Sequence, residues 1–82
     1  MNITEKEFQF LREMITRDLG CFLIDDFQMS LQQAIDAVYT SKTYELLGNP
    51  DSGLYFQSSN YVYQFLKEEI TTGSFDMAAL NL

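Results

Sequence analysis

The side chains that most often carry out chemistry in proteins are nearly absent from this sequence, which contains no histidine and a single cysteine, Cys21. Histidine titrates near neutral pH and is the commonest general base and metal ligand. Without it, neither a Cys–His nor a Ser–His arrangement can form within the chain. We therefore predict that the protein is not an enzyme and that it has no catalytic residue, no cofactor and no metal.

Cys21 lies in an apolar stretch beside Phe22 and Leu23, with no histidine or neighbouring cation to stabilise a thiolate. We expect a buried, structural thiol, which is the usual state of a free cysteine. A single cysteine cannot form an intramolecular disulfide, and the first seven residues lack the basic and then apolar order of a signal peptide. These features are typical of a protein of the reducing cytoplasm.

The remaining candidates for chemistry are carboxylates. Asp25 and Asp26 are neighbours, but successive residues of a helix point about 100° apart, so the two cannot share one proton or one metal ion. Glu68 and Glu69 close the last predicted helix, where acidic residues are mildly unfavourable next to the negative end of the helix dipole. Either they lie on a solvated face, or a basic residue of a partner offsets this cost.

The five tyrosines cluster between residues 39 and 63, at Tyr39, Tyr44, Tyr55, Tyr61 and Tyr63. They either cover a small core, with their hydroxyls reaching water or acidic side chains, or form a protein-binding surface, because tyrosine is enriched at interfaces. Tyr63 is the best candidate for exposure, since it lies off the apolar stripe through Val62 and Leu66. The candidate interaction surface comprises Tyr44, Tyr55, Tyr63, Glu68 and Glu69.

The overall composition favours a folded, acidic globule. The chain has 82 residues, 12 Asp and Glu against 5 Lys and Arg, and a formal charge of −7, yet 46% of it is hydrophobic. That apolar content exceeds what a disordered acidic chain carries. The negative charge opposes binding to phosphate backbones, and no apolar run reaches the length of about 18–20 residues that a membrane-spanning helix needs. We predict neither nucleic acid nor a membrane as a partner.

Capping boxes at residues 4–7 and 30–33 mark the starts of two helices, because in each a Ser or Thr side chain and a Glu or Gln side chain satisfy each other's backbone amides. Apolar residues at three- and four-residue steps then predict one long helix over residues 5–27, straight or bent at Gly20, and a second helix over about 31–40. At about 1.5 Å per residue, the first helix would cross the whole width of so small a domain.

The second half of the chain carries further cap and turn signals. Ser41 caps a short helix that Gly48 is expected to end in a left-handed conformation. The Asn-Pro-Asp-Ser-Gly sequence at 49–53 predicts a chain reversal. Residues 54–56 are expected to plug the core from a loop, with a lone short strand as the alternative. A final helix follows over about 58–73, with a serine cap at its start and a glycine at its end.

These elements predict an all-α fold, a small irregular helical bundle in which a long N-terminal helix packs against two or three shorter helices. We expect a single helical domain over residues 1–73 and a C-terminal tail over 74–82 that is either docked or frayed. The predicted core consists of Phe8, Leu11, Ile15, Leu19, Phe22, Leu31, Ile35, Val38, Leu47, Val62, Phe65 and Leu66. Large apolar residues exceed what so small a globule hides, which favours a homodimer through the first helix or the tail.

Several of these cap and core segments also resemble those of other proteins. Residues that look like a group of short uncharacterised bacterial proteins are Met29-Ser30, Ala34 to Tyr39, Ser41 to Tyr44, Pro50 to Ser59 and Tyr61 to Tyr63. Members of such groups are often encoded beside other small genes, some resembling toxin–antitoxin cassettes, which implies a partner-binding role. The matching positions are helix caps and core residues, so the resemblance implies a shared fold and carries over no functional site.

From these observations we expect a non-enzymatic, acidic protein-interaction module that binds a co-encoded protein. The net charge and the surplus of tyrosines favour this function. The alternative is a small-molecule-binding helical domain with a tyrosine-lined pocket between its helices.

Overall fold

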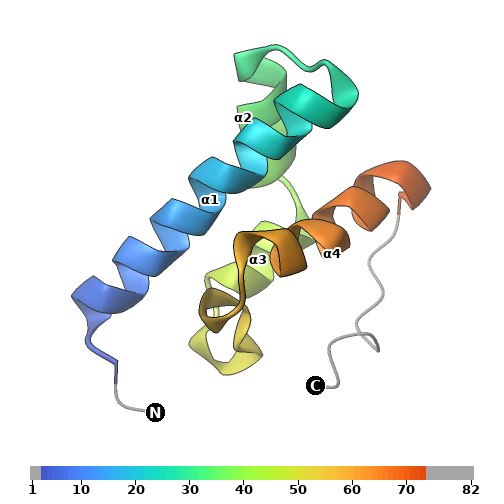
Figure 1. The fold of residues 1–82 in the computed structure, drawn as a ribbon. Coiled ribbons are helices and arrows are strands. Elements are labelled where there is room, and N and C mark those ends of the chain that lie inside the picture. The colour runs from blue at the N-terminus through green and yellow to red at the C-terminus, as the bar shows by residue number, and fades with distance from the viewer. Residues whose placement is uncertain (1–2, 74–82) are drawn as a thin grey trace.

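The computed structural model describes residues 3–73, which form four α-helices and two short 3-10 turns (Figure 1). The elements follow one another in the order α1 (Glu5–Phe27), α2 (Leu31–Tyr39), α3 (Lys42–Leu47), η1 (Pro50–Ser52), η2 (Leu54–Phe56) and α4 (Ser59–Thr72). No strand occurs within these residues. The predicted all-α, irregular bundle with a long N-terminal helix against shorter helices is confirmed. The predicted tail, residues 74–82, lies outside the described residues.

Each α-helix begins where a polar side chain caps it. Thr4 and Ser30 form the two predicted capping boxes. Thr4 Oγ1 accepts a hydrogen bond of 3.1 Å from the amide of Glu7, and the Glu7 carboxylate accepts one of 3.1 Å from the amide of Thr4. Ser41 and Ser58 cap α3 and α4 by accepting from the amide three residues later. These bonds satisfy amides that a first helical turn leaves unpaired, so local sequence is enough to place the helix starts.

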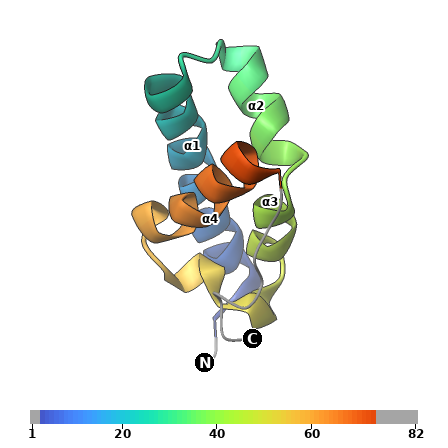
Figure 2. The same cartoon turned by 90° about the vertical axis from the view of Figure 1, so that its right-hand side faces the viewer.

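α1 is the longest element, and the other elements pack along it. Its 23 residues form one helix that continues through Gly20 and, at about 1.5 Å per residue, measures about 35 Å, close to the 38 Å long axis of the molecule. α2 lies beside the C-terminal half of α1, while α4 packs on another side of α1 (Figures 1 and 2). α3 follows α2 and packs against α4.

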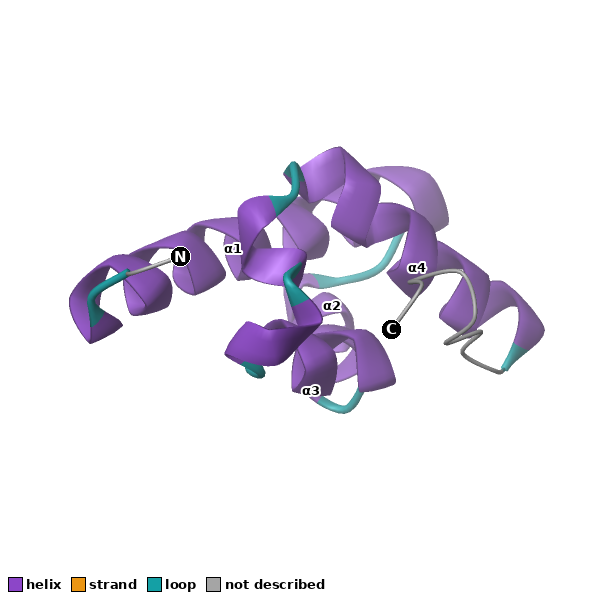
Figure 3. Ribbon diagram, turned by 90° about the horizontal axis from the view of Figure 1, so that it is seen from below, coloured by secondary structure: helices purple, strands orange, loops and turns teal. Residues whose placement is uncertain are grey.

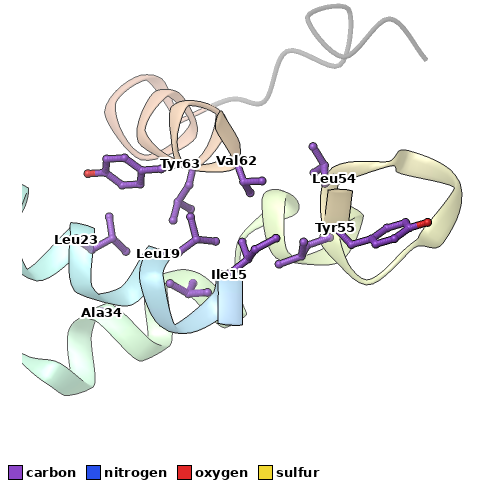
Figure 4. Close-up of a cluster of buried hydrophobic side chains, with 11 residues drawn as sticks. Ile15, Leu19, Leu23, Ala34, Leu54, Tyr55, Val62 and Tyr63 are labelled. Atoms are coloured by element: carbon purple, nitrogen blue, oxygen red, sulfur yellow. The ribbon is translucent and has the colours of Figure 1, made fainter. Parts of the chain in front are cut away.

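The core lies where these helices meet, and Figure 4 shows most of it. Its buried apolar side chains are Ile15, Leu19, Leu23, Ala34, Val38, Leu47, Leu54, Tyr55, Val62, Tyr63 and Leu66. Four other predicted core residues are half-buried against it, namely Phe8, Leu11, Phe22 and Phe65. Leu54 and Tyr55 enter from η2, as predicted for a segment that plugs the core, whereas Phe56 is exposed. Burial of each large apolar side chain stabilises the fold by about 1.5–3 kcal/mol.

The prediction that Leu31 and Ile35 belong to the core is wrong, because these residues are 67% and 39% exposed. α2 buries Ala34 and Val38 alone, since it packs on α1 and on the neighbouring α3 along one narrow side. The apolar stripe of α2 is therefore wider than the side that the described residues cover.

Gly48 ends α3, but not in the predicted left-handed conformation, because its φ is −78°. Its amide donates to the carbonyl of Tyr44, so the last turn closes with right-handed backbone angles. A Cβ atom at this position would lie 2.9 Å from Nη2 of Arg12, so a larger residue would displace the end of that side chain. Gly53 and Gly73 do adopt a left-handed φ of 75°, at the predicted chain reversal and at the end of α4.

Candidate interaction site

An open groove of about 450 Å³ lies between α1 and α2. Its apolar lining comes mainly from Gly20, Cys21 and Ile24 of α1 and from Leu31, Ile35 and Val38 of α2. Polar residues and two tyrosines line its other end, namely Gln9, Arg12, Glu13, Thr16, Arg17, Tyr39 and Tyr44. The groove thus combines an apolar floor with a charged end.

Local sequence explains why two helices lie side by side here. α1 ends at Phe27, the left-handed φ of 59° at the capping residue Gln28 turns the chain, and Ser30 caps the start of α2 two residues later. This short connection makes α2 run back along α1. Gly20 and Ala34 both line the groove, and their side chains are too small to fill the space between the helices.

Arg12 is the cation at the charged end of the groove. Its Cζ atom lies 4.6 Å from the centroid of the Tyr44 ring, in a cation–π contact. Its Nε is buried without a hydrogen-bond partner, and the ion pairs within residues 3–73 do not include it. Arg17 also lines the groove, 3.6 Å from Asp18, instead of forming the pair with Glu13 that its spacing would allow. The groove therefore holds a cation whose hydrogen bonds are incomplete.

Two large apolar side chains are exposed on the N-terminal half of α1. Phe10 is 64% exposed, and Met14 is also exposed, one turn further along the same helix. Seen from below, the first turns of α1 extend beyond the shorter helices (Figure 3). On α2, the exposed apolar side chains are Leu31, Ile35 and Tyr39, and all three line the groove.

The prediction that Tyr63 is exposed is wrong, since this residue is 6% exposed. Its ring packs on Phe22, with 4.9 Å between the ring centroids, and its hydroxyl donates a hydrogen bond of 2.6 Å to Oδ2 of Asp26. α4 turns Tyr63 toward the core (Figure 4) and Tyr61 outward, because its buried stripe is rotated relative to the predicted one. Tyr63 is a core residue and does not belong to an open surface.

Tyr55 and Tyr44, the other two tyrosines of the predicted surface, lie in different places. Tyr55 is buried, with its ring centroid 5.1 Å from that of Phe8, so its assignment to a surface is wrong. Tyr44 is half-buried, lines the groove and packs edge-on against Tyr39 at 4.8 Å. Among the three predicted tyrosines, Tyr44 is the one that borders the groove.

Glu68 and Glu69 also separate in the fold. Glu68 is exposed on α4, whereas Glu69 is half-buried against the start of α3. The Glu69 carboxylate accepts hydrogen bonds from the amide of Lys42 at 2.7 Å and from the amide and hydroxyl of Thr43 at 3.1 and 2.9 Å. The positive end of the α3 dipole stabilises this charge, so the expected cost of an acid at the end of α4 is offset within the chain. Glu69 does not require a partner's cation.

The prediction of a buried Cys21 is wrong, because this residue is exposed and lines the groove. Leu23, two positions later, points into the core, and Phe22 is half-buried against it. Successive helix residues point about 100° apart, so an apolar sequence neighbourhood does not place every member inside.

The sequence allowed a tyrosine-lined pocket between helices, but it did not predict that this pocket lies between α1 and α2. Its α2 side was assigned to the core, and charged residues interrupt its α1 side. The one local signal is Gly20, because glycine within a helix costs about 1 kcal/mol relative to alanine. A Cβ atom at Gly20 would meet nothing within 4 Å, so the described residues do not require glycine there.

Tyr63→Phe is expected to lower the free energy of unfolding by about 1 kcal/mol at pH 7, because it removes the hydrogen bond to Asp26. Burial, this hydrogen bond and the Asp26 charge raise the pKa of Tyr63 above its ordinary value. The folded chain therefore keeps the proton, while the unfolded chain releases it above about pH 10. The stability that Tyr63 contributes is complete below that pH and is lost above it.

Urea unfolding of the wild type and Tyr63→Phe at pH 7 and pH 11 checks this expectation. The difference in unfolding free energy between the two proteins should shrink at pH 11. An equal difference at both pH values would mean that the Tyr63 hydroxyl titrates alike in the folded and unfolded chains.

Comparison with known proteins finds no relative: no family model, no curated protein and no solved structure matches this chain. Within residues 3–73, no helix combines the length and the apolar character needed to cross a membrane. The same residues contain no group of three His, Cys, Asp or Glu side chains placed to hold a metal ion.

Proposed function

We propose that this chain is a non-enzymatic protein-interaction module whose groove between α1 and α2 receives an amphipathic helix of a protein partner. The observation that carries the proposal is the set of exposed apolar side chains that line the groove, namely Leu31, Ile35 and Tyr39. Contiguous apolar surface on a small domain typically marks an interaction site.

A helix suits the shape of the groove. Two helices that lie side by side leave a furrow between their ridges, and a third helix can pack into it at about 8–10 Å between axes. Gly20 and Ala34 line the groove and have little or no side chain, so the backbone of an incoming helix can approach α1 and α2 closely.

The charges around the groove define the polar side of the partner helix. Arg12 and Arg17 are two of the five basic residues in a chain of net charge −7. A carboxylate of the incoming helix could accept charge-assisted hydrogen bonds from the Arg12 guanidinium. We therefore propose a partner helix with an apolar stripe and at least one Asp or Glu.

Outside the groove, the acidic surface favours a partner that is basic around this helix. We propose that the partner is encoded beside this chain and that the two meet in the cytoplasm. A second copy of the chain also carries a helix of the required kind, namely α1.

An apolar small molecule with a carboxylate is the second candidate for the groove. The volume of 450 Å³ is typical of small-molecule sites, which occupy about 300–1,000 Å³, and Tyr39 and Tyr44 line one end. This candidate corresponds to the tyrosine-lined pocket expected from the sequence, although two tyrosines contribute to it rather than five.

A photo-crosslinking amino acid in place of Ile35 tests the proposal in cells that produce the chain naturally. We expect a covalent protein adduct from position 35 and none from Gln64, an exposed control position on α4. Mass spectrometry should map the adduct to a peptide with apolar residues at helical spacing and an Asp or Glu. The proposal fails if position 35 gives no protein adduct or if both positions give the same one. A small-molecule adduct would favour the second candidate.

A further inference from the structure

We infer that the groove receives α1 of a second copy, so that two chains pack through antiparallel α1 helices into a two-fold symmetric dimer. This inference rests on the proposed function, because it uses the same groove, and it places a second copy of the chain there instead of a co-encoded partner. It starts from a stripe of α1 residues at alternating three- and four-residue steps, namely Phe10, Glu13, Arg17, Gly20 and Ile24. Residues with this spacing share one side of a helix, as in helices that pair along their length.

Apart from Ile24, which packs partly against the core, the stripe lies outside the core and follows the groove. Glu13, Arg17, Gly20 and Ile24 line the groove, and the exposed Phe10 continues the same side toward the N-terminus. α2 lies beside the C-terminal half of α1, so the N-terminal half extends past it (Figures 1 and 3). In an antiparallel dimer, the C-terminal half and α2 of one copy would cover the N-terminal half of the other.

The charges of the stripe complement each other when the two helices are antiparallel. Glu13 and Arg17 are one turn apart, and a two-fold axis at the level of Ile15 brings Glu13 of each copy opposite Arg17 of the other. A parallel pair in register would instead place like charges together. The Arg17 side chain is 72% exposed and its partner Asp18 lies 3.6 Å away, so most of the guanidinium remains accessible to a second carboxylate.

The same antiparallel register places a large exposed side chain, that of Phe10, opposite a glycine, Gly20. Phe10 of one copy then lies at the level of Gly20 of the other, once on each side of the axis. The space around a Cβ at Gly20 is open to at least 4 Å, so an aromatic ring can approach the backbone there. This contact gives the glycine within α1 a physical reason that the single chain does not supply.

Sedimentation equilibrium over about 1–500 µM tests the dimer, and we expect the mass of the wild type to rise from monomer to dimer. Glu13→Arg and Arg17→Glu should each weaken association at least about tenfold, because each places like charges opposite one another. The double exchange should restore the dissociation constant to within about threefold. The control Glu68→Arg makes the same charge change as Glu13→Arg on α4 and should leave association unchanged.

The outcomes separate this inference from the proposed function. A wild type that stays monomeric overturns the dimer, whereas the sequence of the peptide crosslinked to position 35 shows whether another protein or a second copy enters the groove. A dimer that resists both single exchanges, or that the double exchange fails to restore, overturns the antiparallel register. Circular dichroism verifies the folding of each variant. Glu13→Gln and Arg17→Gln replace any variant that fails to fold, since they remove the pair without adding charge.

Discussion

Glu69→Gln is expected to lower the free energy of unfolding by about 2 kcal/mol. The Glu69 carboxylate accepts three hydrogen bonds from Lys42 and Thr43 at the start of α3, and it faces the positive end of that helix dipole. A glutamine oxygen carries no full charge and offers fewer acceptor sites, so the hydrogen bonds weaken and part of the α3 start is left unpaired. Because small domains are stable by about 5–15 kcal/mol, this loss is a considerable fraction of the total.

Glu68→Gln is the matched control, since it removes the same charge from an exposed neighbour on α4. Its effect on urea unfolding at pH 7 should stay within about 0.5 kcal/mol. The amide resonances of Lys42 and Thr43 should shift in Glu69→Gln and remain in place in Glu68→Gln. If Glu69→Gln instead leaves stability unchanged and weakens the binding of a partner, Glu69 is an interaction residue after all.

Carboxylates connect α4 to the rest of the fold at three points. Besides the contact of Glu69 with α3, Asp18 of α1 accepts a hydrogen bond of 2.6 Å from the hydroxyl of Ser59 at the start of α4. Asp26 accepts one of 2.6 Å from Tyr63 in the middle of α4. Some of the acidic residues therefore hold α4 in place. For this reason, the net charge of the chain does not by itself indicate a binding surface.

The helices could be predicted from the sequence because their determinants are local. The caps at Thr4, Ser30, Ser41 and Ser58 act on amides within three residues, so a short window of sequence contains both partners. The long α1 also follows from periodicity, since a single glycine without a neighbouring turn signal does not end a helix.

The face that each helix buries could not be predicted in the same way. Tyr63 is buried and Tyr61 is exposed because of where α1 lies relative to α4, and Ile35 is exposed because α1 covers one narrow side of α2. Periodicity shows that an apolar stripe exists, but the neighbouring helices decide which part of it is covered. The groove is a product of that arrangement, so residues such as Arg12 that define it carry no local signal.

Substitutions at Gly20 are expected to change folding and association in opposite directions. Gly20→Ala should raise the free energy of unfolding of the single chain by about 0.5–1 kcal/mol, because alanine favours the helix and its Cβ would meet no atom within 4 Å. Gly20→Leu should also stabilise the monomer, since leucine has a comparable helix propensity and its Cβ would meet no atom within 4 Å. Urea unfolding at protein concentrations below the dissociation constant of the dimer measures the effect on the monomer alone, because association itself adds stability.

The dimer should be strongest in the wild type, weaker in Gly20→Ala and weakest in Gly20→Leu, since the space for Phe10 of the second copy is progressively filled. Overpacking typically costs about 1–3 kcal/mol, so we expect Gly20→Leu to raise the dissociation constant about thirtyfold in sedimentation equilibrium. Phe10→Ala combined with Gly20→Leu should recover part of that loss, because removal of the ring relieves the clash. Strictly additive losses would show that the two residues do not meet. If Gly20→Leu leaves the dissociation constant unchanged, the chains associate through a different face. Close approach of a second copy is then not the reason why residue 20 is a glycine.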